Sequence, residues 1–294
     1  MDESEWLTER FEEHRTRLRG VAYRMLGSLS EADDAVQEAW LRLNRTDTSG
    51  VDNLAGWLTT VVARVSLNML RTRETQRERP LDAHRPDPAA GAEDGGDPEQ
   101  EAVLADSVGL ALLVVLDTLT PAERLAFVLH DMFGVPFDEI GPMIERSPAA
   151  ARQLASRGRR RVKGSAPVPE ADLVRQRRVV DAFLAASRGG DFEALVRLLD
   201  PDVVLRADQE AGPTPAPIVL RGVRSVAKGA RLASVRARST QPALVNGAVG
   251  LVMAPRGRLA LVLAFTIIGD RITEIDVIAN PDRLDRLDLA VLDD

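Results

Sequence analysis

The sequence predicts a multidomain protein in which two all-α modules precede an α+β domain. Apolar residues recur at helical spacing over residues 6–73 and again over residues 101–164. Residues 80–100 are rich in proline, glycine, alanine and aspartate and have no hydrophobic period, which is typical of a flexible acidic linker. After residue 170 a helix is followed by runs of β-branched residues. Helices followed by strands indicate an α+β domain whose sheet wraps a helix or a cavity.

The composition excludes several kinds of site. The chain of 294 residues has no cysteine, so it has neither disulfides nor thiolate metal sites. Its three histidines are scattered, and we expect no metal and no cofactor. The N-terminus lacks an apolar signal core, and no run reaches the ~18 apolar residues of a membrane span. We therefore expect a cytoplasmic protein that does not enter a membrane.

The first module contains two informative helices. Ser30 is the expected N-cap of a helix over residues 31–43, and a second, long helix over residues 54–73 ends in a basic segment. The outer side of the first helix has an acidic ridge at helical spacing, for which a plain solvated face is the alternative. The acidic ridge consists of Asp33, Asp34, Gln37 and Glu38.

The second module is predicted to contain a helix-turn-helix. Helices over residues 101–116 and 121–132 lead to a short helix that begins after Pro136. A turn at residues 144–146 follows, and a second helix begins with Ser147 as N-cap and Pro148 at its first position. Pro142 should kink the short helix or end it early.

The last helix of this module is expected to present one small face and one basic face. Ala151, Ala155, Gly158 and Val162 recur on one side. From Ser147 to Lys163 there are six basic residues and no acidic one, although the whole chain has a net charge of −7. Such segregated charge is typical of a site-specific DNA-binding protein, whereas a solvated cationic helix is the alternative.

The third domain is predicted from a change in periodicity. Helices are expected over residues 172–187 and 192–199, followed by strands over residues 203–207, 244–253, 258–268 and 271–278. Gly269 and Asp270 form a tight turn between the last two strands, which indicates an antiparallel hairpin.

Three stretches resemble the extracytoplasmic-function sigma factors of bacterial RNA polymerase. SEADDAVQEAWLRL, at residues 30–43, is similar to the region 2 helix that docks on the polymerase clamp. NLAGWLTTVVARVSLNMLR, at residues 53–71, is similar to the helix that opens the −10 element. LDTLTPAERLAFVLHDMFGVPFDEI followed by SPAAARQLASRGRRRV is similar to region 4, which recognises the −35 element. The resemblance implies that the partners are core RNA polymerase and promoter DNA.

The resemblance also implies which residues contact these partners. The acidic ridge would bind the polymerase. The set expected at the −10 element combines hydrogen-bonding loop residues and a basic helix face: Thr46, Asp47, Thr48, Ser49, Asn53, Arg64, Asn68, Arg71 and Arg73. The set expected at the −35 element lies on the last helix of the helix-turn-helix: Ser147, Ala149, Ala150, Arg152, Gln153, Ser156, Arg157, Arg159 and Arg160.

The C-terminal part resembles the SnoaL-like cone found in one subgroup of these sigma factors. NPDRL, at residues 280–284, is similar to the motif near the end of that domain. The linker lacks the subgroup's tryptophan-leucine-proline motif, and its glycine-rich acidic motif occurs only as DQEAG at residues 208–212. The residues that we expect to regulate activity in cis are Asp208, Glu210, Asn280, Pro281, Asp282, Arg283 and Leu284, and whether the domain binds a small molecule stays open.

The predicted domains are residues 1–79 (region 2), 80–100 (linker), 101–164 (region 4) and 170–294 (SnoaL-like). Two other functions remain as alternatives. A ligand-sensing helix-turn-helix regulator would leave the first module unexplained. A SnoaL-like isomerase or cyclase with a DNA-binding tail would use Asp208, Glu210 and Asp276 as acid–base groups. No histidine or tyrosine accompanies these carboxylates, so we expect no catalytic residues and no enzyme.

Overall fold

The computed structural model describes residues 3–46, 51, 53–77, 109–164, 170–212, 216–237, 239–255 and 258–292. The chain forms two compact units. The first unit comprises Met1–Val108 and Leu119–Arg159, and the second comprises Gly109–Thr118 and Arg160–Asp294. The predicted linker at residues 80–100 lies outside the described residues.

Three helices form one half of the first unit: α1 (Glu3–Leu26), α2 (Leu29–Leu43) and α3 (Leu54–Arg77). They pack on one another through fully buried aliphatic side chains such as Leu18, Met25 and Leu58. The prediction that Ser30 caps the second helix is wrong. Helix α2 begins two residues earlier than expected, with Ser28 as N-cap, and the Ser28 side chain makes no capping hydrogen bond.

The other half of the first unit begins at α6 (Pro121–Phe127), which continues as the π-helical turn η1 (Val128–Met132). The predicted helix start is confirmed, because Thr120 and Glu123 form a reciprocal capping box. Helices α7 (Phe137–Met143) and α8 (Pro148–Lys163) follow, and α8 crosses from the first unit into the second between Arg159 and Arg160.

The second unit contains a seven-stranded sheet of order β2-β1-β6-β5-β4-β3-β7. Its strands are β1 (Leu199–Ala207), β2 (Ile218–Arg221), β3 (Thr240–Val245), β4 (Ala248–Met253), β5 (Leu261–Ile268), β6 (Arg271–Ile278) and β7 (Leu289–Ala290). Strand β1 pairs with β6 in parallel, and the other neighbours are antiparallel. The mixed sheet confirms the predicted α+β domain.

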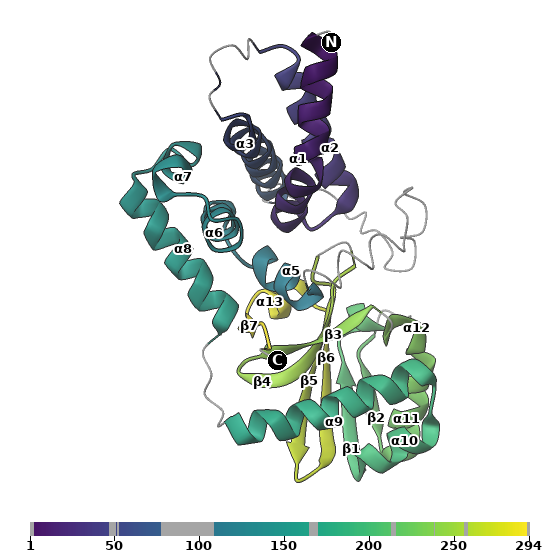
Figure 1. The fold of residues 1–294 in the computed structure, drawn as a ribbon. Helices are drawn as coiled ribbons and strands as arrows, with labels where there is room; N and C mark the ends of the chain where they lie inside the picture. Colours follow the sequence, from purple (N-terminus) through teal and green to yellow (C-terminus); the bar gives the residue numbers. More distant parts are fainter. Residues whose placement is uncertain are drawn as a thin grey trace. The chain divides into compact units, whose positions relative to one another are not determined.

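Helices cover one face of this sheet, as Figure 1 shows for α9. They are α9 (Glu170–Gly189), α10 (Phe192–Leu198) and α11 (Val223–Leu232), followed by the single turn α12 (Ser234–Ala237). Val180, Phe183 and Leu195 pack there against Leu244 and Leu251 of the sheet. The described sheet therefore wraps helices, which is one of the two predicted options.

The predicted strand over residues 244–253 is wrong, because the chain makes the β3–β4 hairpin there. Asn246 and Gly247 have φ values of 51° and 81°, as a tight hairpin turn requires. Both faces of the hairpin are buried, so its two strands are apolar throughout. The sequence therefore looks like one continuous strand, and the turn is not apparent from the pattern. Leu244 faces the helices, whereas Val245 faces a second apolar cluster.

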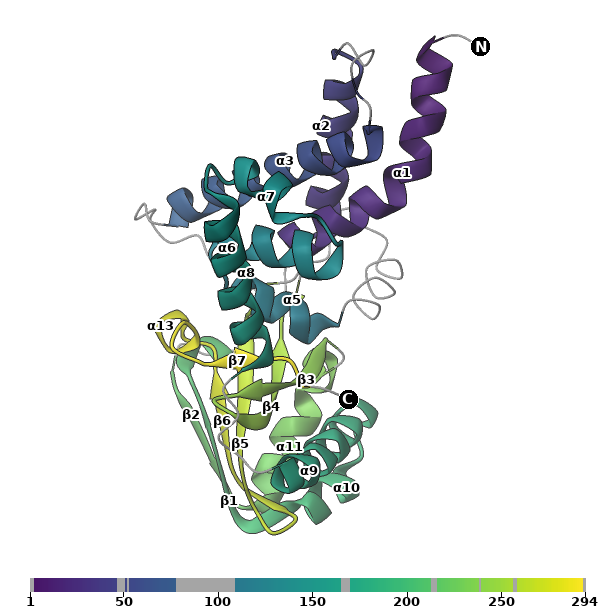
Figure 2. The ribbon, with the colours of Figure 1, turned by 60° about the vertical axis from the view of Figure 1, so that its left-hand side comes forward.

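That second cluster brings distant segments together. Val114 and Val115 of α5 (Leu110–Asp117) pack with Val245, and also with Leu284 and Leu289 of the C-terminal segment. Leu284 ends the short helix α13 (Pro281–Leu284). Figure 2 shows α5 beside β3 and β7, with which it makes contacts. A helix predicted to start region 4 therefore belongs to the compact unit of the C-terminal domain.

Candidate nucleic-acid interface and C-terminal polar cluster

The predicted helix-turn-helix is present, and its turn depends on a glycine. A Cβ at Gly141 would lie 2.8 Å from the main-chain oxygen of Arg146, so only glycine allows this approach. Glu145 in the turn has a φ of 57°. Helix α7 continues through Pro142 and ends at Met143, so the proline lies inside the last turn of the helix, where it has no amide to donate to the turn before it.

Helix α8 is held by its small inner face. Ser147 accepts a hydrogen bond from the amide of Ala150, as expected for the N-cap. Ala151, Ala155 and Gly158 are buried, and a Cβ at Gly158 would lie 3.0 Å from Cβ of Phe127. The backbone of α8 therefore lies directly against α6, and its opposite face points to solvent.

The residues expected at the −35 element occupy this outer face. Ser147, Ala149, Arg152, Gln153, Arg157 and Arg160 are exposed, and Ala150, Ser156 and Arg159 are half-buried. Three of the arginines have protein contacts. The guanidinium of Arg152 lies 5.3 Å from the ring centroid of Phe137. That of Arg159 lies 2.6 Å from a carboxylate oxygen of Asp131. That of Arg157 lies 3.9 Å from a carboxylate oxygen of Glu123.

The acidic ridge lies on the outer side of α2. Asp33, Asp34 and Gln37 are exposed, while Glu38 is half-buried. Arg19 lies 2.7 Å from Asp33, and Arg42 lies 2.9 Å from Glu38. These exposed ion pairs are worth little to stability, so the ridge can exchange them for a basic partner surface.

The residues expected at the −10 element, apart from Arg73, fall into three groups. Asn53, Arg64, Asn68 and Arg71 are exposed along α3, and Asn53 also accepts a hydrogen bond from the amide of Gly56. Thr46 is exposed just after the end of α2. Asp47, Thr48 and Ser49 lie outside the described residues.

Arg73 differs from the other arginines of α3. Its guanidinium donates to the main-chain oxygen of Leu26 at 3.1 Å and forms an ion pair with Glu31. Only 16% of its side chain is exposed. These contacts hold α3 on the α1–α2 pair and give Arg73 a structural task within region 2.

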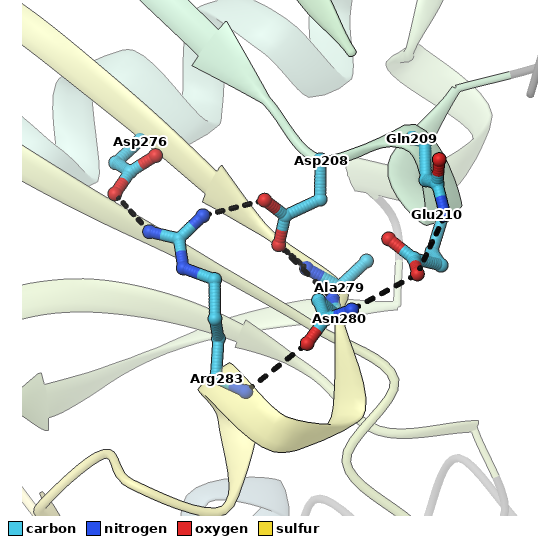
Figure 3. Close-up of polar contacts among 7 residues, drawn as sticks. All are labelled: Asp208, Gln209, Glu210, Asp276, Ala279, Asn280 and Arg283. Carbon is cyan, nitrogen blue, oxygen red and sulfur yellow. Dashed lines mark hydrogen bonds and ion pairs between the residues drawn. The ribbon is translucent and has the colours of Figure 1, made fainter. Parts of the chain in front are cut away.

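The two C-terminal motifs meet in one polar cluster, which Figure 3 shows. A carboxylate oxygen of Asp208 accepts hydrogen bonds from the amides of Ala279 at 3.1 Å and Asn280 at 3.0 Å. Its other oxygen lies 2.5 Å from the guanidinium of Arg283. Asn280 caps α13 and donates to Glu210. Asp208 therefore ties the end of β1 to the start of the C-terminal segment.

Arg283 also pairs with a residue that no motif indicated. Asp276 on β6 lies 2.6 Å from the second guanidinium nitrogen of Arg283. Sequence reasoning had weighed Asp276 only as an acid–base group, because no local spacing links it to Arg283. The register of β6 beside β1, which pairs Asp276 with Arg206, brings the two carboxylates to one end of the sheet.

The electrostatics of the cluster favour the charged forms of Asp208 and Glu210. Burial by itself raises the pKa of Asp208. Hydrogen bonds from the amides of Asn280 and Ala279, together with the hydrogen bond and charge of Arg283, lower it by more, and the pKa of Asp208 therefore lies below its ordinary value. The pKa of Glu210 is also lowered, first by its own backbone amide and then by Asn280. Bases that abstract protons near neutral pH need raised values, so the cluster suits structure rather than acid–base chemistry.

The three other residues of the expected regulatory set lie on α13. Pro281 and Asp282 are exposed in the first turn of α13, whereas Leu284 is buried against α5. The backbone amide of Val291 donates to Val162 in the last turn of α8 at 3.0 Å. The C-terminal segment therefore contacts both α5 and the end of α8.

In the part of the chain that the structure describes, no group of three or more histidine or acidic side chains is arranged to hold a metal ion. None of the helices in this part of the chain has the length and hydropathy of a membrane span.

Comparisons with known proteins agree with the helical modules. A family model for Sigma-70 region 2 matches residues 10–76, and one for Sigma-70 region 4 matches residues 109–162. The ECF RNA polymerase sigma factor SigJ of Mycobacterium tuberculosis (strain ATCC 25618 / H37Rv) is 38% identical, over 93% of this chain and 91% of the relative. The probable ECF RNA polymerase sigma factor SigI of the same strain is 35% identical, over 93% of each chain.

The solved structure of the extracytoplasmic function sigma factor SigJ of Mycobacterium tuberculosis is 35% identical, with a TM-score of 0.47, and covers 94% of this chain and 97% of that one. The relatives extend over both sigma regions and the C-terminal domain. With identity above 30% over nearly the whole length of two relatives, the chain belongs to the ECF RNA polymerase sigma factors.

Proposed function

We propose that this chain binds core RNA polymerase through the acidic ridge of α2 and directs transcription from promoters with a −10 and a −35 element. It is a transcription initiation factor and not an enzyme, and it works in the cytoplasm with the polymerase. The exposed face of α3 would contact the −10 DNA, with Arg64 and Arg71 on phosphates. The exposed face of α8 would enter the major groove at the −35 element.

One observation carries the proposal. The same chain presents an exposed acidic ridge on α2 and, on a separate helix-turn-helix, an exposed basic face on α8. An ordinary helix-turn-helix regulator needs only the second surface. A factor that recruits polymerase to a site needs both, because one surface holds the enzyme while the other selects the DNA.

We further propose that the C-terminal domain is SnoaL-like and regulates the sigma modules in cis. The support is the cluster in which Leu284 and Leu289 pack on Val114 and Val115 of α5. Residues 1–79, 101–164 and 170–294 would act as region 2, region 4 and regulatory domain. Asp208, Arg283 and the Asn280 cap would set the position of the C-terminal segment on α5.

The test is transcription in vitro by core polymerase on fragmented genomic DNA, with the 5′ ends of the transcripts sequenced. We expect the protein to add transcription start sites that share two upstream sequence motifs. If it adds no start sites to those of core polymerase alone, the proposed function is refuted. A chain ended after Pro281 loses most of α13 and β7, and we expect its transcript levels to change. An unchanged profile would rule out regulation through this segment.

A further inference from the structure

The ring of Phe137 contacts side chains from the elements before and after α7. Phe137 is the first residue of α7, which meets α8 at the turn of the helix-turn-helix (Figure 1). Its ring is stacked on the imidazole of His130 in η1, with the two ring centroids 3.9 Å apart. The guanidinium of Arg152 on α8 lies over the Phe137 ring, 5.3 Å from its centroid. Two rings, the ring pair His130 and Phe137, therefore support an arginine that is proposed to contact the −35 element.

The backbone after η1 fixes the first member of the ring pair. The amide of Val135 donates to the main-chain oxygen of Leu129 at 2.9 Å, which folds this segment back on η1. The main-chain oxygen of Val135 lies 3.1 Å from Nδ1 of His130. A carbonyl oxygen can only accept, so Nδ1 carries the proton and donates it to this bond. His130 cannot turn its ring without losing the bond, and it therefore gives Phe137 a fixed surface.

The contact of Arg152 differs in kind from those of two other arginines on α8. Arg159 pairs with the carboxylate of Asp131. Arg157 lies near a second carboxylate, that of Glu123. An aromatic ring attracts a guanidinium through its π face and has no oxygen that accepts hydrogen bonds. The ring can therefore orient Arg152 while leaving its charge and its N–H donors available, and a base edge requires those donors.

Orientation before binding matters for this side chain. Arg152 is exposed, and it lies in the first half of α8, the half that faces base edges when a recognition helix enters the major groove. A long side chain loses rotamer freedom when it is fixed against a partner, and this loss weakens binding. A contact that restricts Arg152 before DNA arrives reduces the loss and favours one direction of the guanidinium.

We propose that His130 and Phe137 are positioning residues, which hold Arg152 in the direction in which it reads a base pair of the −35 element. The inference rests on the proposed function and adds a determinant of its specificity. The ring pair itself does not contact DNA in this proposal. Loss of a ring should therefore change which base pairs are distinguished, and not the general attraction of the protein to DNA.

The test measures base discrimination by the holoenzyme. Each base pair of the −35 element is replaced in turn, and the affinity for every promoter is measured with the wild type, Arg152→Ala, Phe137→Leu and Phe137→Tyr. The base pairs at which Arg152→Ala loses discrimination are those that Arg152 reads. Leucine keeps apolar bulk but has no aromatic face, whereas tyrosine keeps the face. Phe137→Tyr is therefore the matched control.

At the base pairs that Arg152 reads, we expect Phe137→Leu to reduce discrimination by about two- to fivefold, the effect of losing a cation–π contact at an exposed site. Phe137→Tyr should keep the discrimination of the wild type. Added to Arg152→Ala, Phe137→Leu should have no further effect, because the ring acts on DNA only through Arg152. Discrimination at the −10 element and binding of core polymerase should not change.

Several results would overturn the proposal. One is wild-type discrimination in Phe137→Leu or in Arg152→Ala. Another is an equal loss at every base pair of the −35 element, as a general loosening of the helix-turn-helix would produce. A loss that persists when Phe137→Leu is added to Arg152→Ala would also exclude a positioning role. If the wild-type holoenzyme itself distinguishes no base pair of the −35 element, the proposed function fails instead.

A second pair of variants leaves Phe137 in place. His130→Leu removes the ring and its hydrogen bond to Val135, whereas His130→Phe keeps a ring that can stack. We expect His130→Leu to lose about twofold in discrimination at the base pairs that Arg152 reads, and His130→Phe to lose less. Thermal unfolding of each variant shows whether the fold is kept. Equal losses in the two folded variants would mean that ring stacking does not position Arg152.

Discussion

Helices α3 and α8 carry the same kind of surface but present it differently. Both place arginines and amide side chains on one face and pack the other against neighbouring helices. On α8, the face with Arg152 and Gln153 points to solvent. On α3, Arg64 and Arg71 are also exposed, but they line an open hollow whose other side is formed by Pro142, Met143 and Glu145.

The difference shows that residue type alone does not determine what a basic helix face lies beside. Sequence patterns assign equivalent roles to the two helices, because a basic stripe at helical spacing looks the same in both. Tertiary packing separates them. The small inner face of α8 holds it against α6, whereas the outer face of α3 lies beside the end of α7.

The largest loss of transcription is expected from substitutions on the outer face of α8. Arg152→Ala combined with Arg157→Ala removes two guanidinium groups from the outer face, and a good bidentate contact to a base is worth about 1–3 kcal/mol. We expect run-off transcription from a −35-dependent promoter to fall by at least about 100-fold, with core polymerase binding intact.

A matched control is Arg10→Ala combined with Arg15→Ala. These exposed α1 arginines pair with neighbouring glutamates, and their replacement takes away the same charge. Equal losses in the two double variants would mean that net charge, and not the α8 face, directs promoter binding. Loss of polymerase binding by the α8 variant would count against the assignment of α8 as well.

The second effect tests α3. Arg64→Ala with Arg71→Ala removes two proposed phosphate contacts, and each contact contributes about one counterion to the salt dependence. We expect transcription to fall by about tenfold and the slope of log affinity against log salt to decrease by about 2. The measurement is holoenzyme binding to promoter DNA at several salt concentrations. An unaltered slope would remove these arginines from the interface.

The sequence allowed the helix-turn-helix to be predicted almost residue by residue, because each of its signals is local. The Thr120 capping box, the Ser147 cap, Pro148 and the small stripe act within one or two turns of helix. Ser30 was a weaker case, since Ser28 lies two residues away and is an equally good cap residue. Local rules cannot choose between two such neighbours.

The C-terminal domain was harder to predict because its contacts join distant residues. Asp208 and Arg283 are 75 positions apart, and their ion pair depends on strand order. The packing of α5 with the C-terminal segment depends in the same way on tertiary structure. The β3–β4 hairpin was different, because Asn246-Gly247 is a local turn signal that a continuous apolar run concealed.

The third effect concerns the anchor of the C-terminal segment, which touches α8 through Val162. Asp208→Asn keeps the size of the side chain but removes the charge that faces Arg283. Since Arg283 is 43% exposed, we expect a modest loss of about 1–2 kcal/mol in the free energy of unfolding at pH 7. Thermal and urea unfolding would measure it.

The pH dependence of that loss has a definite sign. Folding lowers the pKa of Asp208. The charged carboxylate therefore stabilises the protein fully at pH values above the pKa of Asp208 in the unfolded chain. This stabilisation is lost as the pH falls through the lower pKa of Asp208 in the folded protein. The difference between wild type and Asp208→Asn should therefore shrink below about pH 4. A constant difference across pH 3–7 would show that the loss does not come from the carboxylate charge at this position.

The smallest effect distinguishes two neighbouring arginines of α8. Arg159 lies 2.6 Å from Asp131, whereas Arg160 is exposed. A DNA phosphate must compete with Asp131 for Arg159, so Arg159→Ala should weaken promoter binding less than Arg160→Ala, which we expect to cost about threefold. Asp131→Asn should strengthen binding slightly, because it releases the Arg159 charge to the DNA. Salt titrations of the three variants would measure this, and a weaker Asp131→Asn complex would mean that the ion pair positions Arg159 for its phosphate instead of competing with it.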